Sequence, residues 1–240
     1  MAGKPLKHKD TIEVIYDKKH WDLLNELRKK ALFIMQALNK YGIESYIHGS
    51  VARGDVNSKS DVDIIIPYTL SSNKIELALM ISNIEIYSRK IVQATPSHSP
   101  KGHIYLNADE SICVTFPLFS FKKLEFEFYK FGGLLGVKEL KAGLRTPGCT
   151  KRLTLIEPIP KGHYETLIIG KEVEVAKKLG ISIDIVKERI RVLLRRDEIG
   201  RTGIFLSIEL HKNEGFEKVL KKLIESNPAV RRTYFEREFN

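Results

Sequence analysis

The residues best suited to chemistry lie between positions 48 and 66, in the stretch His48-Gly-Ser-Val-Ala-Arg-Gly-Asp-Val-Asn-Ser-Lys-Ser-Asp-Val-Asp-Ile-Ile-Ile66. Asp61 and Asp63 are two residues apart at the start of an apolar strand, so alternation places both carboxylates on one face. Two neighbouring carboxylates repel each other unless a cation lies between them. Mg²⁺ uses one or two carboxylates together with substrate phosphates. The spacing therefore predicts a magnesium site.

The turn that precedes these aspartates predicts a phosphate site. A strand runs into Gly49-Ser50, and a short helix is expected to begin there. Because Gly49 has no side chain, the backbone can approach a phosphate closely, and free amides with the Ser50 hydroxyl can donate hydrogen bonds to it. Arg53, about one turn later, can add a permanent positive charge.

Gly49-Ser50, ten residues, then Asp61-Val62-Asp63 resembles the signature of the DNA polymerase β-type nucleotidyltransferase superfamily, which includes poly(A) polymerases, CCA-adding enzymes and antibiotic nucleotidyltransferases. The flanking Ala52-Arg53-Gly54 and Ser60 resemble the smaller prokaryotic members. The layout of the whole chain resembles an uncharacterised archaeal group of predicted nucleotidyltransferases with a C-terminal helical module.

This resemblance implies an enzyme that uses Mg²⁺ or Mn²⁺ and transfers a nucleoside monophosphate from an NTP to a hydroxyl, with release of pyrophosphate. Asp61 and Asp63 would be its catalytic metal ligands. The nucleotide would be bound by Gly49, Ser50, Arg53 and Ser60. The alternative is a nucleic-acid-binding regulator that keeps the fold but performs no transfer.

Such enzymes usually supply a third carboxylate from a neighbouring strand. Leu124–Phe131 alternates like a strand, which places Glu125 and Glu127 on one face and apolar side chains on the other. Family layout does not decide between the two, and Glu127 is favoured as catalytic metal ligand because it lies nearer the middle, with Glu125 second. In the alternative interpretation, both glutamates line the solvated face of an amphipathic strand.

The C-terminal part predicts a second module. Val175–Leu194 resembles a helix-turn-helix with Gly180 in the turn, and Ile204–Leu210 could form a wing or a further hairpin. Spacing of four residues places Lys187, Arg191 and Arg195 in one basic stripe on the second helix, suited to nucleic acid. The alternative is an ordinary packed helix pair with a solvated basic edge.

Periodicity and turn residues give the expected architecture. We expect an α/β (α+β) nucleotidyltransferase domain with a short mixed sheet at residues 1–150, then a smaller, mostly helical, winged-helix-like domain at 151–240. The expected helices are Trp21–Tyr41, Ser71–Ser88, Lys171–Leu179 and Ile183–Arg196, and the expected strands are Ile43–His48, Val62–Ile66, His103–Asn107 and Ile112–Phe116.

Composition narrows the class of protein. The net charge of +10 favours polyanionic partners only slightly, since a Lys-rich surface also serves solubility. The basic second module makes RNA the first acceptor to consider, with a protein or a small molecule behind it and DNA as another partner. No apolar run approaches the roughly 20 residues of a membrane helix, and the charged N-terminus is unlike a secretory signal, so a soluble, cytoplasmic protein is expected. Cys113 and Cys149 have no zinc-binding pattern and are expected to be buried thiols.

Overall fold

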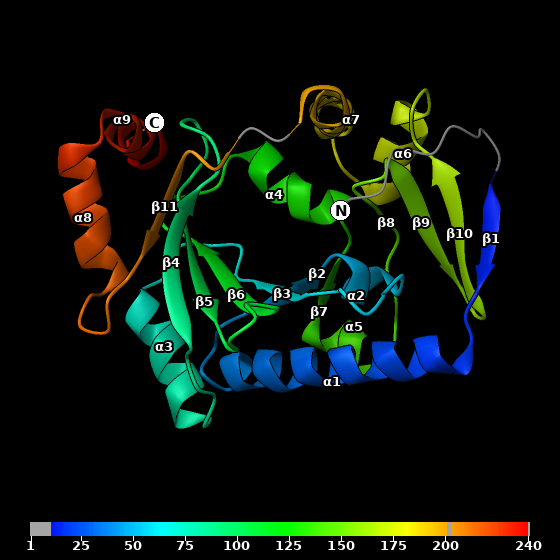
Figure 1. Ribbon diagram of the computed structural model, residues 1–240, viewed down its shortest axis with the longest axis horizontal. Coiled ribbons are helices and arrows are strands. Elements are labelled where there is room, and N and C mark those ends of the chain that lie inside the picture. The colour runs from blue at the N-terminus through cyan, green and yellow to red at the C-terminus, as the bar shows by residue number, and fades with distance from the viewer. Residues whose placement is uncertain (1–10, 201–202, 240) are drawn as a thin grey trace. The chain divides into compact units, whose positions relative to one another are not determined.

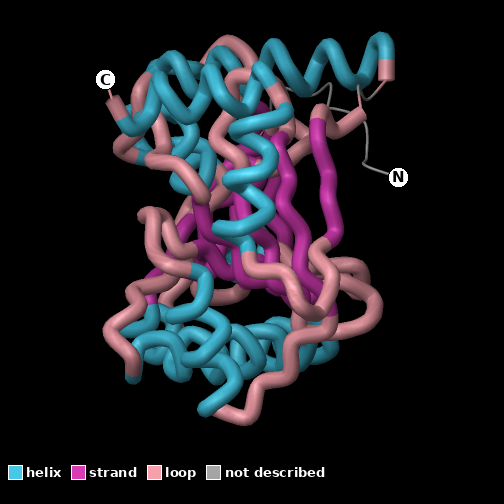
Figure 2. Tube along the Cα trace, turned by 90° about the vertical axis from the view of Figure 1, so that its left-hand side faces the viewer, coloured by secondary structure: helices cyan, strands magenta, loops and turns pink. Residues whose placement is uncertain are grey.

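The computed structural model describes residues 11–200 and 203–239, which contain both helices and strands (Figures 1 and 2). The chain divides into two compact units. Residues 11–30, 47–60 and 123–200 form the first, and residues 31–46, 61–122 and 203–239 form the second. This division differs from the boundary expected near residue 150, because residues 123–200 stay together.

The first unit contains an antiparallel sheet in the order β1-β10-β9-β8. A buried core forms where helices α4, α6 and α7 pack, and it includes Leu153, Ile168 and Val186, which are fully buried (Figure 1). The elements of this sheet and core are β1 (Ile12–Ile15), β8 (Gly148–Cys149), β9 (Thr154–Ile159), β10 (Gly162–Leu167), α4 (Lys123–Phe131), α6 (Glu172–Leu179) and α7 (Ile183–Ile199).

Shorter elements complete the first unit around the Gly49-Ser50 turn. Strand β2 (Tyr46–His48) lies next to β7 (Leu134–Gly136), and the turn leads into α2 (Ser50–Arg53). Helix α5 (Val137–Lys141) follows β7 directly. The long helix α1 (Lys18–Lys40) contributes its first part, to residue 30, to this unit and the rest to the second.

The second unit holds a mixed sheet with strand order β11-β4-β5-β6-β3, in which only the β3–β6 pair is parallel among these strands. One face is apolar and buried: the Phe116 ring packs edge-on against Phe216 at 5.1 Å. A Cβ at Gly102 would lie 2.3 Å from the Phe116 ring, so only glycine permits this packing. The elements are α3 (Ser72–Ile81), α8 (Phe216–Ser226), α9 (Pro228–Glu238), β3 (Val62–Ile65), β4 (Ser88–Gln93), β5 (Lys101–Tyr105), β6 (Ile112–Pro117) and β11 (Leu206–Glu209).

Three expected elements differ from the structure. The helix expected at Ser71–Ser88 ends at Ile81, and β4 begins at Ser88. The expected strand Leu124–Phe131 is helix α4. The segment Ile204–Leu210 is no wing beside α7, because β11 pairs antiparallel with β4 in the second unit.

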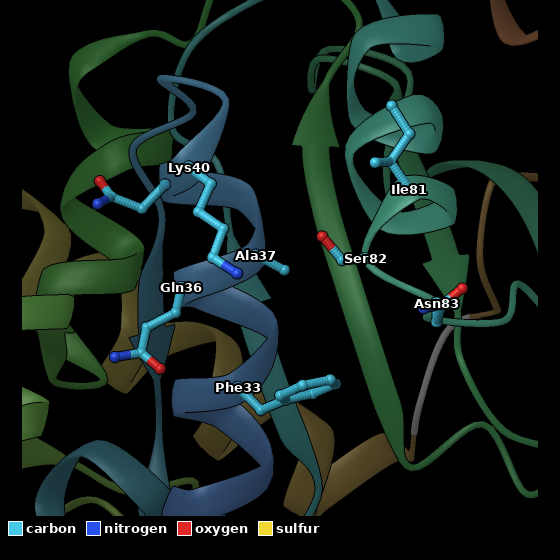
Figure 3. A pocket seen from close by; sticks show the side chains of 8 residues that line it. Phe33, Gln36, Ala37, Lys40, Ile81, Ser82 and Asn83 are labelled. Atoms are coloured by element: carbon cyan, nitrogen blue, oxygen red, sulfur yellow. The ribbon is translucent and has the colours of Figure 1, made fainter.

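Among the described residues, no helix combines the length and apolar character needed to cross a membrane. A hollow of about 540 Å³ lies in the second unit beside the ends of α1 and α3 (Figure 3). Its lining carries no carboxylate, and neither Asp61 nor Asp63 contributes to it. The carboxylate chemistry therefore has to be sought on the sheet.

Candidate active site

The turn after β2 has the geometry that its sequence predicts. Gly49 adopts φ 80° and ψ −144°, a backbone conformation almost restricted to glycine. Its carbonyl accepts hydrogen bonds from the N–H groups of Ala52 (3.1 Å) and Arg53 (3.0 Å), which starts α2. The Gly49 N–H itself donates to the Gly133 carbonyl at 3.1 Å, so this amide is already used inside the protein.

Two serines connect this turn to the segment that leads to the aspartates. The Ser50 hydroxyl donates to the Ser60 hydroxyl at 3.2 Å. Ser60 Oγ also accepts from the Asn57 N–H at 2.9 Å, and the Ser60 N–H donates to the Asn57 carbonyl at 2.9 Å. Ser60 immediately precedes Asp61 in the sequence. The hydroxyl pair therefore holds the loop 57–60 against the turn.

Arg53, the last residue of α2, has its guanidinium hydrogen-bonded within the protein. Its side chain is 6% exposed, and the guanidinium donates twice to the Asp55 carboxylate, at 2.9 and 2.8 Å. It also donates to the carbonyls of Gly132 and Cys149. A buried arginine with this set of partners fixes the backbone around α2, and the phosphate contact of Arg53 stays a prediction.

The two aspartates lie at the start of β3, in the mixed sheet. Asp63 is exposed on β3, and Asp61, just before the strand, is exposed as well. Val62 and Ile64 between and after them are each 1% exposed. The strand begins with a 2.7 Å hydrogen bond from the Val62 N–H to the Ser111 carbonyl. This alternation places the two carboxylates on the same face, away from the apolar core.

Oxygen donors of this kind fit a divalent cation such as Mg²⁺, which needs only one or two carboxylates when phosphates complete its shell. Within residues 11–200 and 203–239, no three His, Cys, Asp or Glu side chains gather as a ready-made metal site. The neighbour of Asp63 on β6 is Cys113, and burial raises the pKa of this thiol to about 12. Cys113 is therefore a neutral thiol beside Asp63, and Cys149 is buried as well.

Glu125 and Glu127, the candidates for the third carboxylate, lie on helix α4. The strand alternation that had suggested a shared face is therefore absent. Side chains two residues apart on a helix point to different sides, and Glu125 and Glu127 are both 7% exposed. The Glu127 carboxylate accepts a hydrogen bond from the Ser182 N–H at 3.2 Å and another from its hydroxyl. Ser182 precedes the first residue of α7. Glu127 therefore stabilises a helix N-terminus, where negative charge is favourable.

The basic residues predicted to contact nucleic acid are exposed on α7 in the first unit: Lys187, Arg191 and Arg195. Arg189, between them in the sequence, lies with its guanidinium 5.0 Å from the Phe128 ring centre. Burial lowers the pKa of Arg189. The Arg189 side chain thus packs inside the first unit through contact with an aromatic face.

Residues that the sequence did not single out share the face of Asp63. They are His103 and Tyr105 on β5 and Thr115 on β6. The alternation of polar and apolar residues in both strands was a usable signal for this face. No comparable signal in the sequence indicates the strand register that brings this face beside Asp63.

Comparison with known protein families gives a match. Residues 27–109 match the family model of the nucleotidyltransferase domain. This part of the chain is therefore similar to such a domain, and the matched range includes the Gly49 turn, both aspartates, His103 and Tyr105. It ends before Glu127 and α7. No curated protein matches the chain.

Proposed function

We propose that this protein is a metal-dependent nucleotidyltransferase that transfers a nucleoside monophosphate from an NTP to a hydroxyl group and releases pyrophosphate. The observation that carries the proposal is the pair of exposed carboxylates, Asp61 and Asp63, on one side of a strand whose other residues are buried. The match of residues 27–109 to the nucleotidyltransferase domain supports it.

In this mechanism Asp61 and Asp63 would hold Mg²⁺ or Mn²⁺. When bound, these ions supply positive charge for the triphosphate and lower the pKa of the attacking hydroxyl. The Gly49-Ser50 turn, which the hydroxyl pair of Ser50 and Ser60 holds in place, contributes the phosphate contacts. The acceptor oxygen attacks the α-phosphorus, the bond to the bridging oxygen of pyrophosphate breaks, and the hydroxyl proton is lost to solvent. We assign no third carboxylate to this chain.

The acceptor is proposed to be RNA. Lys187, Arg191 and Arg195 are exposed on α7, and a stripe of three cations can contact successive phosphates. The net charge of +10 acts in the same direction. A protein or a small hydroxyl compound is the next acceptor to test.

The test is incubation with each labelled NTP, Mg²⁺ or Mn²⁺, and separate pools of RNA, protein and small hydroxyl compounds. We expect label in the RNA pool, with release of pyrophosphate, from wild type but not from Asp63→Asn. Glu85→Gln, which changes an exposed acid elsewhere in the second unit, is the matched control and should transfer normally. Turnover that survives Asp63→Asn would reject the catalytic role of Asp63. RNA binding without label in any pool would reject the enzyme and favour the binding-only alternative.

A further inference from the structure

The sheet of the second unit presents a row of polar side chains that begins at Asp63. Asp63 is the register partner of Cys113 on β6, and Cys113 is the partner of Tyr105 on β5. Register partners project from the same face of a sheet. Since adjacent strands are roughly 5 Å apart, the backbones of Asp63 and Tyr105 are about 10 Å apart. A phenol side chain reaches over much of that distance.

The ring of Tyr105 is fixed by its neighbours. The His103 ring lies nearly parallel to it, at an angle of 13° and a centre distance of 6.1 Å. The Lys90 ammonium lies 5.2 Å from the ring centre and forms an ion pair with Glu110. His103 is itself held by the Thr115 hydroxyl at 3.1 Å. These contacts leave the ring little freedom, and its place is set before any ligand arrives.

The Tyr105 hydroxyl is a hydrogen-bond donor that the fold does not use. In the part of the chain that the structure describes, no group forms a hydrogen bond with it. Burial raises the pKa of Tyr105 to about 12, and the charges of Glu110 and Asp63 act in the same direction. The phenol therefore keeps its proton at neutral pH and can donate a hydrogen bond to a ligand beside Asp63.

The charge on this row selects against an anion. Glu110 neutralises Lys90, and the His103 ring is neutral because burial, with the charges of Lys101 and Lys90, lowers its pKa to about 4. Lys101, further along the same face, lies over the Phe121 ring at 5.3 Å. The carboxylate of Asp63 repels a phosphate that arrives without a cation. An uncharged group rich in hydroxyls fits these surroundings.

We propose that Tyr105 is a binding residue for the acceptor, and that its hydroxyl donates a hydrogen bond to an uncharged sugar hydroxyl placed beside Asp63. The inference deepens the proposed function and rests on it. The sugar could belong to the terminal ribose of an RNA or to a free sugar, and the chemistry of recognition is the same in both.

The test compares Tyr105→Phe with wild type. The substitution removes one oxygen and keeps the ring that contacts Lys90 and His103. Tyr87→Phe is the matched control, because Tyr87 is 60% exposed in the same unit. Labelled transfer is measured with three acceptor probes: an oligoribonucleotide, free ribose and a serine-rich protein. KM is determined separately for the acceptor and for the NTP.

We expect label in the oligoribonucleotide or in ribose, and a KM for that acceptor that rises about threefold to tenfold in Tyr105→Phe, as for one lost hydrogen bond. The KM for the NTP and the melting temperature should stay as in wild type. An unchanged acceptor KM, equal losses for acceptor and NTP, or label in the protein alone would overturn the role of Tyr105 and leave the transferase standing. No transfer by wild type to any probe would overturn the proposed function itself, and this inference with it.

Discussion

Two segments of this chain have the same acid-x-acid pattern but differ in secondary structure and in the burial of their carboxylates. Asp61-Val62-Asp63 lies at the start of a strand, where both carboxylates are exposed. Glu125-Phe126-Glu127 lies in helix α4, where both glutamates are buried and Glu127 holds Ser182 at the start of α7. An acid-x-acid pattern therefore marks a shared face only where the backbone is extended. Carboxylates that the fold already satisfies are poor candidates for a metal.

The largest expected effect concerns the exposed aspartate pair and its role in catalysis. Asp63→Asn should lower nucleotidyl transfer by about a thousandfold, because charge stabilisation worth several kcal/mol is lost. The side chain is exposed, so the melting temperature should remain within a few degrees of wild type. Turnover of labelled NTP and thermal unfolding measured on the same preparation check this. A variant that still transfers at a tenth of the wild-type rate would contradict it.

A second prediction concerns the stability of the face that carries Asp63. Burial lowers the pKa of His103 from its ordinary value of 6.5 to about 4 in the folded protein, so the unfolded chain takes up this proton first as the pH falls. The stability contribution of neutral His103 is therefore complete above pH 6.5 and is lost as the pH falls toward 4, by about 3 kcal/mol at most.

Urea unfolding at pH 7.0, 5.5 and 4.5 measures this loss. His103→Gln should show a smaller loss over the same interval, since glutamine does not titrate. Equal pH dependence in the two proteins would show that the neutral imidazole does not contribute.

The third prediction concerns the buried glutamate pair and its role in stability. Glu127→Gln removes the charge that accepts two hydrogen bonds from Ser182, and it should lower the free energy of unfolding by about 1–3 kcal/mol. Turnover per folded molecule should change little. A double-mutant cycle with Ser182→Ala isolates the pair. If the cycle showed no coupling while turnover fell a thousandfold, Glu127 would be a catalytic group after all.

The smallest expected effect concerns binding of the acceptor by the basic residues of α7, which is measured independently of the carboxylates. Lys187→Glu combined with Arg191→Glu reverses two exposed charges on α7 and should weaken binding of an oligoribonucleotide about tenfold at moderate salt. The slope of log Kd against log salt should fall by about 2. Titrations at several salt concentrations give both values. A salt response like that of wild type would assign α7 to packing alone.

The sequence anticipates the Asp61 and Asp63 face because extended geometry follows from a short apolar run that ends at Pro67. It misleads at α4, where Leu124, Phe126 and Phe128 alternate, while Leu124, Phe128 and Phe131 also recur at helical spacing. The helical set packs against the core of the first unit. Both periods are present in nine residues, and tertiary packing decides between them.

Two further features depend on distances in three dimensions. The hydrogen bonds from Arg53 to the carbonyls of Gly132 and Cys149 join segments far apart in the chain. The sequence alone could not reveal these partners, and it therefore suggested phosphate as the partner of this side chain. Tyr105 and Asp63 share a face only because of the register of β3, β6 and β5. Register is set by pairing between strands and is weakly encoded within any one of them.

The central claim is that the aspartate pair, and not the glutamate pair, binds the divalent cation. Paramagnetic Mn²⁺ titration in the presence of a non-hydrolysable NTP measures this directly in wild type, in Asp61→Asn with Asp63→Asn, and in Glu125→Gln with Glu127→Gln. We predict that the aspartate variant loses about tenfold or more in Mn²⁺ affinity and that the glutamate variant keeps wild-type affinity once corrected for its folded fraction. Retained affinity in the aspartate variant with a loss in the glutamate variant would contradict the account.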